Sequence, residues 1–301
     1  MANSKVEAET PQPEAFWEHC IREMYPGWMH EHYFVPALHV NKTHYVSSSF
    51  AGQEVSIPQA PLDAPKVGSG CVLHVSDTRN DSALQRIRHC LQKLAIKQRE
   101  TMFVISQLDY GDYLRQPCYA AAADSASASA SATDAAVRLP RAADLKTRDS
   151  RGDFDFLILH RKYGIVVAEV KAVGDNWGDL QLSEEQQTAV VQKRVKDAIK
   201  QLDKAERVLA HLVSDQNLAP RILKALFLPG VQASIVRKSL GRDPKELRNL
   251  GTCLAADPGA DPVDLCLCSD HLSDPEIPWH VTDSVLSRVQ QWWNARIVSQ
   301  P

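Results

Sequence analysis

The sequence predicts an α/β fold in which a central mixed sheet is flanked by helices. Two observations lead to this class. Short apolar runs rich in Val, Ile, Leu and Phe alternate with longer segments whose apolar residues recur every three or four positions. The chain has 301 residues, 44% of them hydrophobic, which is enough for one large domain or two small ones.

The first long helix is expected to begin at Asp81 or Ser82, either of which can cap it, and to end near Arg99. Its apolar residues follow one another at steps of three and four: Leu84, Ile87, Leu91 and Leu94. The run TMFVISQL at residues 101–108 then predicts a strand. This helix and this strand open the core of the predicted fold.

The predicted core continues with a hairpin and a long helix. Residues 153–160 and 165–172 are predicted strands, joined by a tight connection at 161–164. A helix is expected from about Ser183 to about Val213, with an inward stripe of residues at helical spacing: Val191, Val195, Ala198, Leu202, Ala205, Leu209 and Leu212. The remaining predicted elements are two strands and a terminal amphipathic helix, at residues 221–228, 265–268 and 281–297.

The composition changes along the chain and predicts its organisation. We expect a disordered leader, an aromatic and His-rich extension, a main domain, and a C-terminal helix packing on that domain, at residues 1–13, 14–80, 81–275 and 276–301. Within the extension, a short helix is expected at 14–24 and a loop at 47–70. The main domain carries an expected low-complexity insertion at 119–147, built around a run of Ala, Ser, Asp and Thr.

Charge and cysteine content narrow the class of protein. The formal net charge of −3 argues mildly against a dedicated nucleic-acid binder but allows a locally basic rim around an acidic site. No run of about 18 apolar residues is present, so no membrane partner is expected. Seven irregularly spaced cysteines and a polar, acidic N-terminus predict reduced thiols in an intracellular protein, cytoplasmic or nuclear.

Two neighbouring predicted strands carry ionisable residues among apolar ones. Asp155 interrupts the run FDFLIL, and Glu169 and Lys171 interrupt the run IVVAEVKA. Burying an ionised carboxylate is costly unless it is paired or bound to a metal. Because Glu169 and Lys171 are two apart, their side chains project from the same strand face. If the strands pair as an antiparallel hairpin, Asp155 lies opposite the neighbourhood of Glu169 and Lys171.

This constellation predicts metal-dependent phosphate chemistry. Carboxylate oxygens and water are the ligands that Mg²⁺ prefers, so Mg²⁺ or Mn²⁺ is the expected cofactor. Such an ion polarises a phosphate and lowers the pKa of a bound water. Lys171 could orient or deprotonate that water, or stabilise the charge of the pentavalent phosphorane.

Residues 152–172, GDFDFLILHRKYGIVVAEVKA, resemble the central motif of the PD-(D/E)XK nuclease superfamily, and are most similar to nuclease-related (NERD-like) and Holliday-junction-resolvase-like members. The resemblance implies a restriction-endonuclease-like αβββαβ core, which is the order predicted for residues 81–228. It also implies that Asp155 and Glu169 bind the metal, that the carbonyl of Val170 is a further ligand, and that Lys171 is the catalytic lysine. The implied activity is hydrolysis of phosphodiester bonds, with DNA preferred over RNA as the partner and substrate.

The resemblance extends to the following helix and is incomplete upstream. Family members often place a Gln or a basic residue there, and Gln201 is the candidate because it borders the apolar stripe, with Gln192 as the alternative. The proline that often precedes the first acid is missing. Asp153 projects from the same face as Asp155 and competes for the metal, although Asp155 sits deeper in the strand.

Several basic residues are candidate contacts for a nucleic-acid backbone. Arg148 and Arg151 come immediately before the first of the two acidic strands, and Lys193 and Lys200 lie on the long helix. For the helix residues, a solvated surface is the stronger interpretation. The resemblance leaves open a homodimer and a partner NTPase or helicase.

Other interpretations of the same residues remain open. The three charged strand residues could form a structural ion pair, or could belong to an inactive descendant that binds nucleic acid or a partner NTPase. Cys266, Cys268 and His271, with Cys253, fit no common zinc pattern, and buried thiols are the preferred interpretation. The spacing is equally irregular in the N-terminal group of His19, Cys20, His30, His32, His39 and His44.

Overall fold

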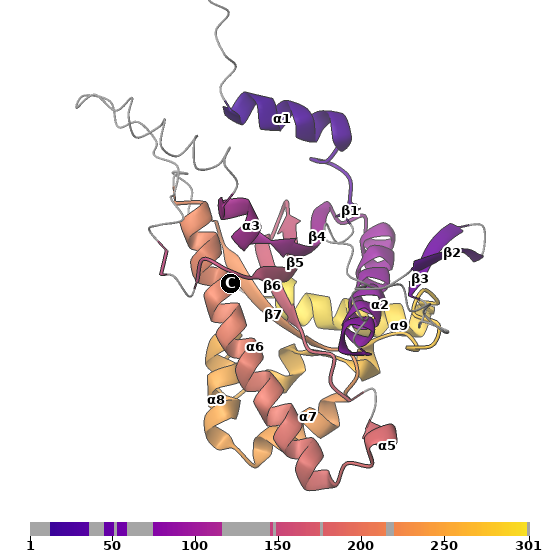
Figure 1. Cartoon of the computed structure of the whole chain (residues 1–301), viewed down its shortest axis with the longest axis vertical. Helices are drawn as coiled ribbons and strands as arrows, with labels where there is room; N and C mark the ends of the chain where they lie inside the picture. The colour runs from indigo at the N-terminus through magenta and orange to yellow at the C-terminus, as the bar shows by residue number, and fades with distance from the viewer. Residues whose placement is uncertain are drawn as a thin grey trace, which may run out of the picture.

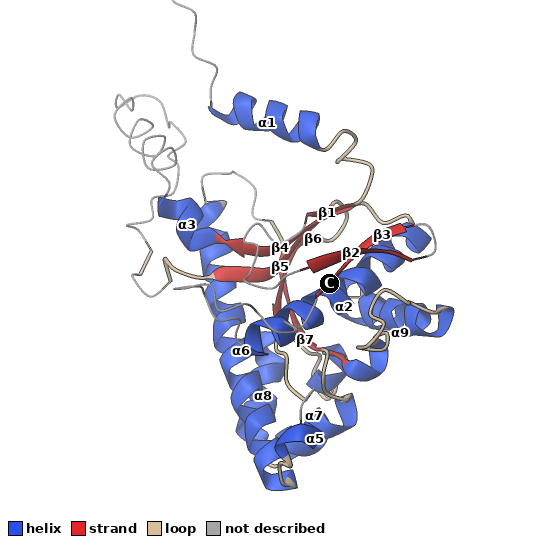
Figure 2. Cartoon of the chain, turned by 45° about the vertical axis from the view of Figure 1, so that its right-hand side comes forward, coloured by secondary structure: helices blue, strands red, loops and turns tan. Residues whose placement is uncertain are grey.

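The computed structural model describes residues 13–35, 45–50, 53–58, 75–115, 145–146, 149–174, 177–214 and 220–299. Within these ranges the chain forms a mixed six-stranded sheet with helices on both faces (Figures 1 and 2). The α/β class predicted from the sequence is confirmed. None of the helices in these ranges is long and apolar enough to cross a membrane.

The main sheet has the strand order β1-β4-β5-β6-β7-β8. Its strands are β1 (Tyr33–Val35), β4 (Met102–Asp109), β5 (Asp153–His160), β6 (Gly164–Val170), β7 (Ile222–Leu228) and β8 (Leu267–Cys268). Strand β5 is antiparallel to both of its neighbours, whereas the remaining pairs are parallel. The carboxyl ends of β4, β6 and β7 therefore meet the beginning of β5 at one edge of the sheet, where ligands of α/β proteins commonly bind.

Helices cover both faces of this sheet. The described α-helices are α1 (Pro13–Met24), α2 (Val75–Gln98), α3 (Tyr110–Arg115), α5 (Trp177–Leu180), α6 (Glu184–Leu212), α7 (Ala233–Gly241), α8 (Pro244–Cys253) and α9 (Asp283–Trp293). Helix α6, backed by α7 and α8, packs on one face, and α2 and α9 pack on the other (Figure 1). Short single-turn helices η2 (Pro262–Leu265), η3 (Ser269–His271) and η4 (Asn294–Val298) complete the described elements.

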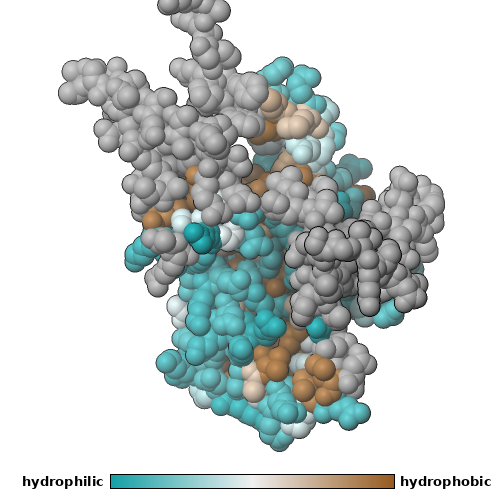
Figure 3. Space-filling view, in the orientation of Figure 1, coloured by the Kyte–Doolittle hydropathy of each residue, from teal (hydrophilic) through white to brown (hydrophobic). Residues whose placement is uncertain are grey.

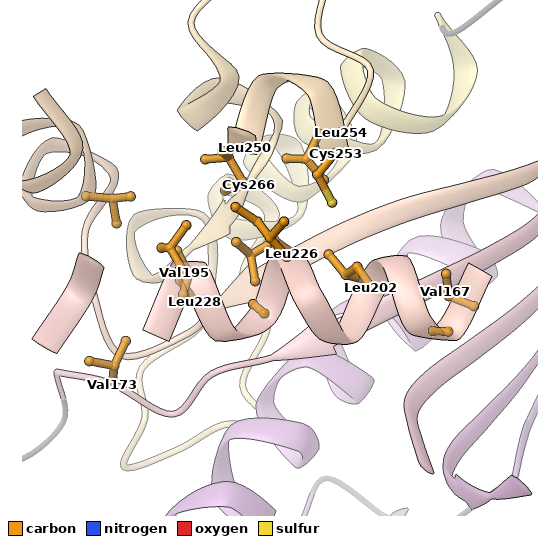
Figure 4. Close-up of a cluster of buried hydrophobic side chains, with 14 of the residues drawn as sticks. Val167, Val173, Val195, Leu202, Leu226, Leu228, Leu250, Cys253, Leu254 and Cys266 are labelled. Carbon is orange, nitrogen blue, oxygen red and sulfur yellow. The ribbon is translucent and has the colours of Figure 1, made fainter. Parts of the chain in front are cut away.

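The core on the α6 side shows why the long helix docks. Val195 and Leu202 of α6 lie against Leu226 of β7 and Leu250 of α8 (Figure 4). Val195, Leu226 and Leu250 are fully buried, and Leu202 keeps only 1% of its surface exposed. Burying such side chains stabilises the fold by roughly 1.5–3 kcal/mol each relative to exposure. The apolar stripe predicted from the sequence is therefore the face that α6 presents to the sheet.

A local signal begins α6 where the sequence predicts it. The Ser183 hydroxyl accepts the Gln186 N–H at 3.3 Å, and the Gln186 side-chain oxygen accepts the Ser183 N–H at 2.8 Å. This reciprocal arrangement satisfies two of the amide groups that would otherwise lack partners at a helix start. The predicted strand at 153–160 coincides with β5, and the predicted strand at 221–228 differs from β7 by one residue.

Two predictions need correction, and several elements were not predicted. Helix α2 begins at Val75 rather than at Asp81, which lies inside the helix and is only 2% exposed, so this Asp is a buried helix residue and not a cap. The predicted loop at 47–70 contains an antiparallel hairpin, β2 (Tyr45–Phe50) with β3 (Gln53–Pro58), because the backbone groups of the two segments pair with each other. Helices α7 and α8 and strand β1 were not predicted.

Other predictions fall outside the described residues or agree with the structure. The short helix expected at 14–24 is α1. The leader except Pro13, the low-complexity run at 120–136, and residues 59–70 of the predicted loop lie outside the described ranges. The terminal helix forms as α9, and its Trp292 and Trp293 are buried against the sheet face opposite α6.

Candidate metal and nucleic-acid site

A tight hairpin joins the two strands that carry the candidate catalytic residues. The registered pairs run from His160–Gly164 at the turn to Phe156–Ala168. Gly164 has φ +85°, and a Cβ atom there would lie 2.6 Å from the Arg221 carbonyl oxygen. Only glycine fits this position without displacing the start of β7. The turn therefore fixes the register that places Asp155 relative to Glu169.

The two strands separate at the level of the acids. Continuing the register beyond Phe156–Ala168 places Asp155 opposite Glu169. No registered pair forms there; instead, the Asp155 Oδ2 atom accepts the main-chain N–H of Val170 at 2.7 Å. A side-chain carboxylate thus takes the position that a main-chain acceptor of β5 would occupy in a continuous ladder. Asp155 therefore lies beside Glu169 across the two strands, as the sequence predicts.

The same hydrogen bond orients the backbone of Val170. In an antiparallel ladder, the N–H and C=O of one residue point toward the same neighbouring strand. Because the Val170 N–H points to Asp155, its carbonyl group lies on the β5 side as well. Lys171 points its own N–H the other way, to the Phe227 carbonyl at 2.9 Å. The site thus offers two carboxylates and one main-chain carbonyl from adjoining strands.

Lys171 forms an ion pair with Glu169. The Lys171 Nζ atom lies 2.5 Å from Glu169 Oε1, and the two side chains are 13% and 9% exposed. The E-x-K spacing thus places the ammonium beside the carboxylate at the carboxyl end of β6, which ends at Val170 rather than at the predicted Ala172. A partly desolvated ammonium so close to the acids can act on a group bound between them.

Burial dominates the electrostatics of the acid pair. It raises the pKa of Glu169, and the neighbouring Asp155 raises it further, while the Lys171 ammonium opposes both effects. Burial also raises the pKa of Asp155, although the Val170 N–H stabilises its ionised form. Ionising both of these facing carboxyl groups at once is unfavourable. Perturbed pKa values of this kind concentrate at functional sites.

This donor set fits a hard divalent cation. Carboxylate and carbonyl oxygens are the ligands of Mg²⁺ and Mn²⁺, and a cation would relieve the repulsion between Asp155 and Glu169. Asp155, Glu169 and the Val170 carbonyl are the residues that would hold it. Nowhere in the described ranges do three or more His, Cys, Asp or Glu side chains form a group suited to a metal ion. A third protein ligand at this site would therefore be a main-chain atom.

Asp153 occupies a different place from Asp155. It pairs in register with Asp109 of β4, and more of its surface is exposed than that of Asp155, although its carboxyl group is partly desolvated. Burial raises the pKa of Asp153, the nearby Asp109 raises it further, and Lys171 and Lys204 lower it. The hydrogen bond to Val170 belongs to Asp155, so Asp155 is the acid held against the E-x-K strand.

The candidate residues of α6 are not gathered at the acid pair. Gln201 is exposed, and the Gln192 side chain donates to the Ser239 carbonyl at 2.9 Å, toward α7. Lys193 is exposed, and Lys200 lies 3.7 Å from Asp197 on the outer face of the helix. This outer face is part of the hydrophilic surface over α6 (Figure 3).

Lys204 of α6 reaches the segment just before β5. Its ammonium donates to the Arg151 carbonyl and lies 5.8 Å from the centroid of the Tyr110 ring. Arg151 itself is exposed, and Arg148 lies outside the described residues. The contact of Lys204 with this segment was not predicted from the sequence.

The Cys and His residues of the C-terminal region behave as core residues. Cys253, Cys266 and Cys268 are buried, and burial raises the pKa of each thiol. His271 accepts the Cys268 main-chain N–H at its Nδ1 atom, 3.1 Å away. These contacts support the interpretation as buried thiols. Of the N-terminal group, His39 and His44 lie outside the described residues.

A mixed six-stranded sheet flanked by helices, with Asp155 facing an E-x-K strand, places this chain in the α/β class with a restriction-endonuclease-like fold. Residues 133–229 match the family model of the nuclease-related domain, NERD. The match covers about a third of the chain and includes β5, β6, α6 and β7. The resemblance to nuclease-related (NERD-like) proteins noted in the sequence is confirmed. No significant similarity to a curated protein or to a solved structure was found.

Proposed function

We propose that this protein is a metal-dependent nuclease that hydrolyses phosphodiester bonds, with DNA preferred over RNA. Asp155, Glu169 and the Val170 carbonyl would hold Mg²⁺ or Mn²⁺. Bound there, the ion would supply Lewis acidity toward a phosphate oxygen and toward water. The match of residues 133–229 to a nuclease-related family supports the reaction class.

One observation carries the proposal more than any other. The ladder between β5 and β6 ends where Asp155 faces Glu169, and Asp155 Oδ2 replaces a main-chain acceptor for Val170. A fold that interrupts its own sheet to face two buried carboxyl groups gains nothing in stability from doing so. Binding of a cation between them accounts for the arrangement.

Lys171 lies where it can assist proton transfer and stabilise the charge that develops during the reaction. Its ammonium is 2.5 Å from Glu169 Oε1 and only partly exposed. There it can orient the attacking water and stabilise negative charge that develops on the phosphate. Gln201 is exposed and the Gln192 side chain donates to the Ser239 carbonyl, so we assign neither of them a chemical step.

Substrate binding is proposed for exposed basic residues of the segment before β5 and of α6. Arg151 and Lys193 are exposed and able to reach a phosphate backbone, and Arg148 precedes them in the chain. Lys200 is a weaker candidate because Asp197 lies beside it. A homodimer, or a partner NTPase or helicase, is compatible with this assignment.

Cellular location is proposed from the thiols. Cys90, Cys253, Cys266 and Cys268 are free and buried. Free thiols are retained in reducing compartments, so we propose an intracellular, cytoplasmic or nuclear protein.

The test is cleavage of labelled DNA and RNA by the full chain in Mn²⁺. Wild type is compared with Glu169→Ala and Lys171→Ala, and folding of each variant is checked by circular dichroism. We expect cleavage by wild type and none by folded variants. Equal cleavage by all three proteins would remove the assignment of the site, and no cleavage of either substrate by wild type would remove the activity.

A second candidate function is a nuclease-like module that binds nucleic acid or a partner NTPase without cleaving. The Lys171–Glu169 ion pair favours it, because Lys171 already neutralises Glu169. Calorimetry with Mn²⁺ separates the two: a folded wild-type protein that binds nucleic acid but no divalent cation supports the non-catalytic module.

A further inference from the structure

Gln107 of β4 has a backbone conformation that its place in a strand does not explain. Its φ angle is +52°, in the left-handed region. The other described non-glycine residues with positive φ lie outside strands, at Arg99, Gln181 and Ala255. Residues other than glycine adopt this conformation in a strand interior only when the surrounding structure holds them there.

This residue lies opposite Asp155. The pairs Ser106–Phe156 and Leu108–Phe154 are in register on either side, and Gln107 falls between them without a registered pair. On the other side of β5, the pairing with β6 also ends at the level of Asp155. Both ladders are therefore interrupted along one row across three strands, formed by Gln107, Asp155 and Glu169.

The Gln107 side chain is buried and lacks a partner. The residue retains only 9% of its surface exposed, and no hydrogen bond joins its side-chain amide to any residue in the described ranges. The amide offers hydrogen-bond donors and an acceptor, and its atoms are not among the fully buried unpaired atoms of the described residues, so they keep contact with solvent and can take a new partner. A glycine would suit the backbone at this position and an apolar residue would suit the burial. A glutamine suits neither requirement.

We propose that Gln107 is a positioning residue of the site, whose amide holds the Asp155 carboxylate in place, directly or through one water, when a divalent cation is bound. This inference rests on the proposed function. The Val170 N–H restrains only the Oδ2 atom of Asp155, from the β6 side. A donor on the β4 side restrains the plane of the carboxylate. Groups that orient a metal ligand in this way typically account for roughly 10–100-fold in metal affinity or activity.

Variants of Gln107 can separate stability from metal binding, because the backbone strain affects stability whereas the side-chain amide is proposed to affect binding. Gln107→Gly removes both the amide and the backbone strain. Gln107→Asn keeps an amide on a residue that tolerates positive φ. Arg99→Gly is the matched control, because Arg99 has nearly the same φ angle, +53°. Arg99 is exposed in the turn after α2, the helix that packs on the sheet face opposite α6.

The experiment measures Mn²⁺ affinity by calorimetry and the midpoint of urea unfolding for the full chain and these variants. We expect Gln107→Gly to unfold at the same or a higher urea concentration than wild type, and to bind Mn²⁺ roughly tenfold more weakly or worse. Gln107→Asn should retain most of the affinity, and Arg99→Gly should bind Mn²⁺ as wild type does.

Three results would overturn the inference in different ways. If wild type and the Gln107→Gly variant bind Mn²⁺ equally well, Gln107 has no role in binding, and the proposed nuclease site is left intact. Wild type that binds no Mn²⁺ removes both proposals. A Gln107→Gly variant that unfolds at a lower urea concentration with unchanged Mn²⁺ affinity identifies Gln107 as a structural residue only.

Discussion

The Asp155 carboxylate accepts the Val170 main-chain N–H at 2.7 Å, across the point where β5 and β6 stop pairing. This bond links the acid of one strand to the middle residue of the E-x-K sequence on the next. It therefore holds Asp155 and Glu169 face to face and turns the Val170 carbonyl to the same side. The predictions below follow from this arrangement.

Replacing Lys171 should separate cleavage from metal binding. Lys171→Met removes the ammonium 2.5 Å from Glu169 Oε1, and with it a positive charge that competes with a cation. We expect the Kd for Mn²⁺ to stay the same or fall, and cleavage to fall by roughly 10²–10⁴-fold. Metal titration and single-turnover cleavage measure the two effects. A variant that loses both together would show that Lys171 only maintains the shape of the site.

The stability of the metal-free protein should fall as the pH rises. Burial raises the pKa of Glu169 and of Asp155 above their ordinary values of 4.5 and 3.8. A carboxyl group whose pKa is higher in the folded state binds more protons in that state than in the unfolded state. Its contribution to stability is therefore complete below its ordinary pKa, and is lost as the pH rises through its pKa in the folded protein.

Urea unfolding at several values from about pH 4 to about pH 8 measures this dependence of stability on pH. The double variant Asp155→Asn/Glu169→Gln is the control and should have a flatter profile. Mn²⁺ should restore wild-type stability most strongly at the higher pH, because metal binding requires the carboxylates to lose their protons. A wild-type stability that rises with pH relative to the double variant is incompatible with the site as described.

The hairpin turn should tolerate no side chain at Gly164. Gly164→Ala places a Cβ atom 2.6 Å from the Arg221 carbonyl oxygen at φ +85°, so we expect a loss of roughly 1–3 kcal/mol from strain, and more from the close contact. Gly259→Ala is the matched control, because Gly259 has φ +88° and open space around it. Equal losses in the free energy of unfolding for the two variants would show that the approach to Arg221 is unimportant.

Removing a phosphate-contacting cation should change the salt dependence of DNA binding. Lys193 is exposed on α6 and has no ion pair with a described residue. In a Lys171→Met background, Lys193→Ala should reduce the slope of log affinity against log salt by about one. Lys97→Ala is the control, since Lys97 pairs with Asp283 at 3.0 Å on the opposite side of the sheet. An unchanged slope for Lys193→Ala would place DNA elsewhere.

Long periodic elements and the acidic strands could be predicted from the sequence. Strand β5 coincides with its prediction, and α6 differs from it by one residue at each end, because the apolar stripe and the Ser183 cap are local signals. The facing of Asp155 and Glu169 follows from alternation along two paired strands. These features depend on neighbours in the chain, which the sequence displays directly.

The missed elements depend on contacts distant in the chain. Strand β1 has three residues and exists through its pairing with β4. Helices α7 and α8 are short and gain their stability by packing on α6. Nothing in the run ISQLD indicates a left-handed Gln107, because the interruption becomes visible only when β4 lies beside Asp155.

The most direct test of the central claim is a calorimetric titration of Mn²⁺ into the full chain at neutral pH, for wild type, Asp155→Asn, Glu169→Gln and the control Lys97→Ala. If Asp155 and Glu169 share one cation, wild type and Lys97→Ala bind one Mn²⁺ with the same affinity, and each of the other two variants loses that binding. Equal Mn²⁺ affinity in all four proteins, with all four folded, would contradict a cation held between Asp155 and Glu169.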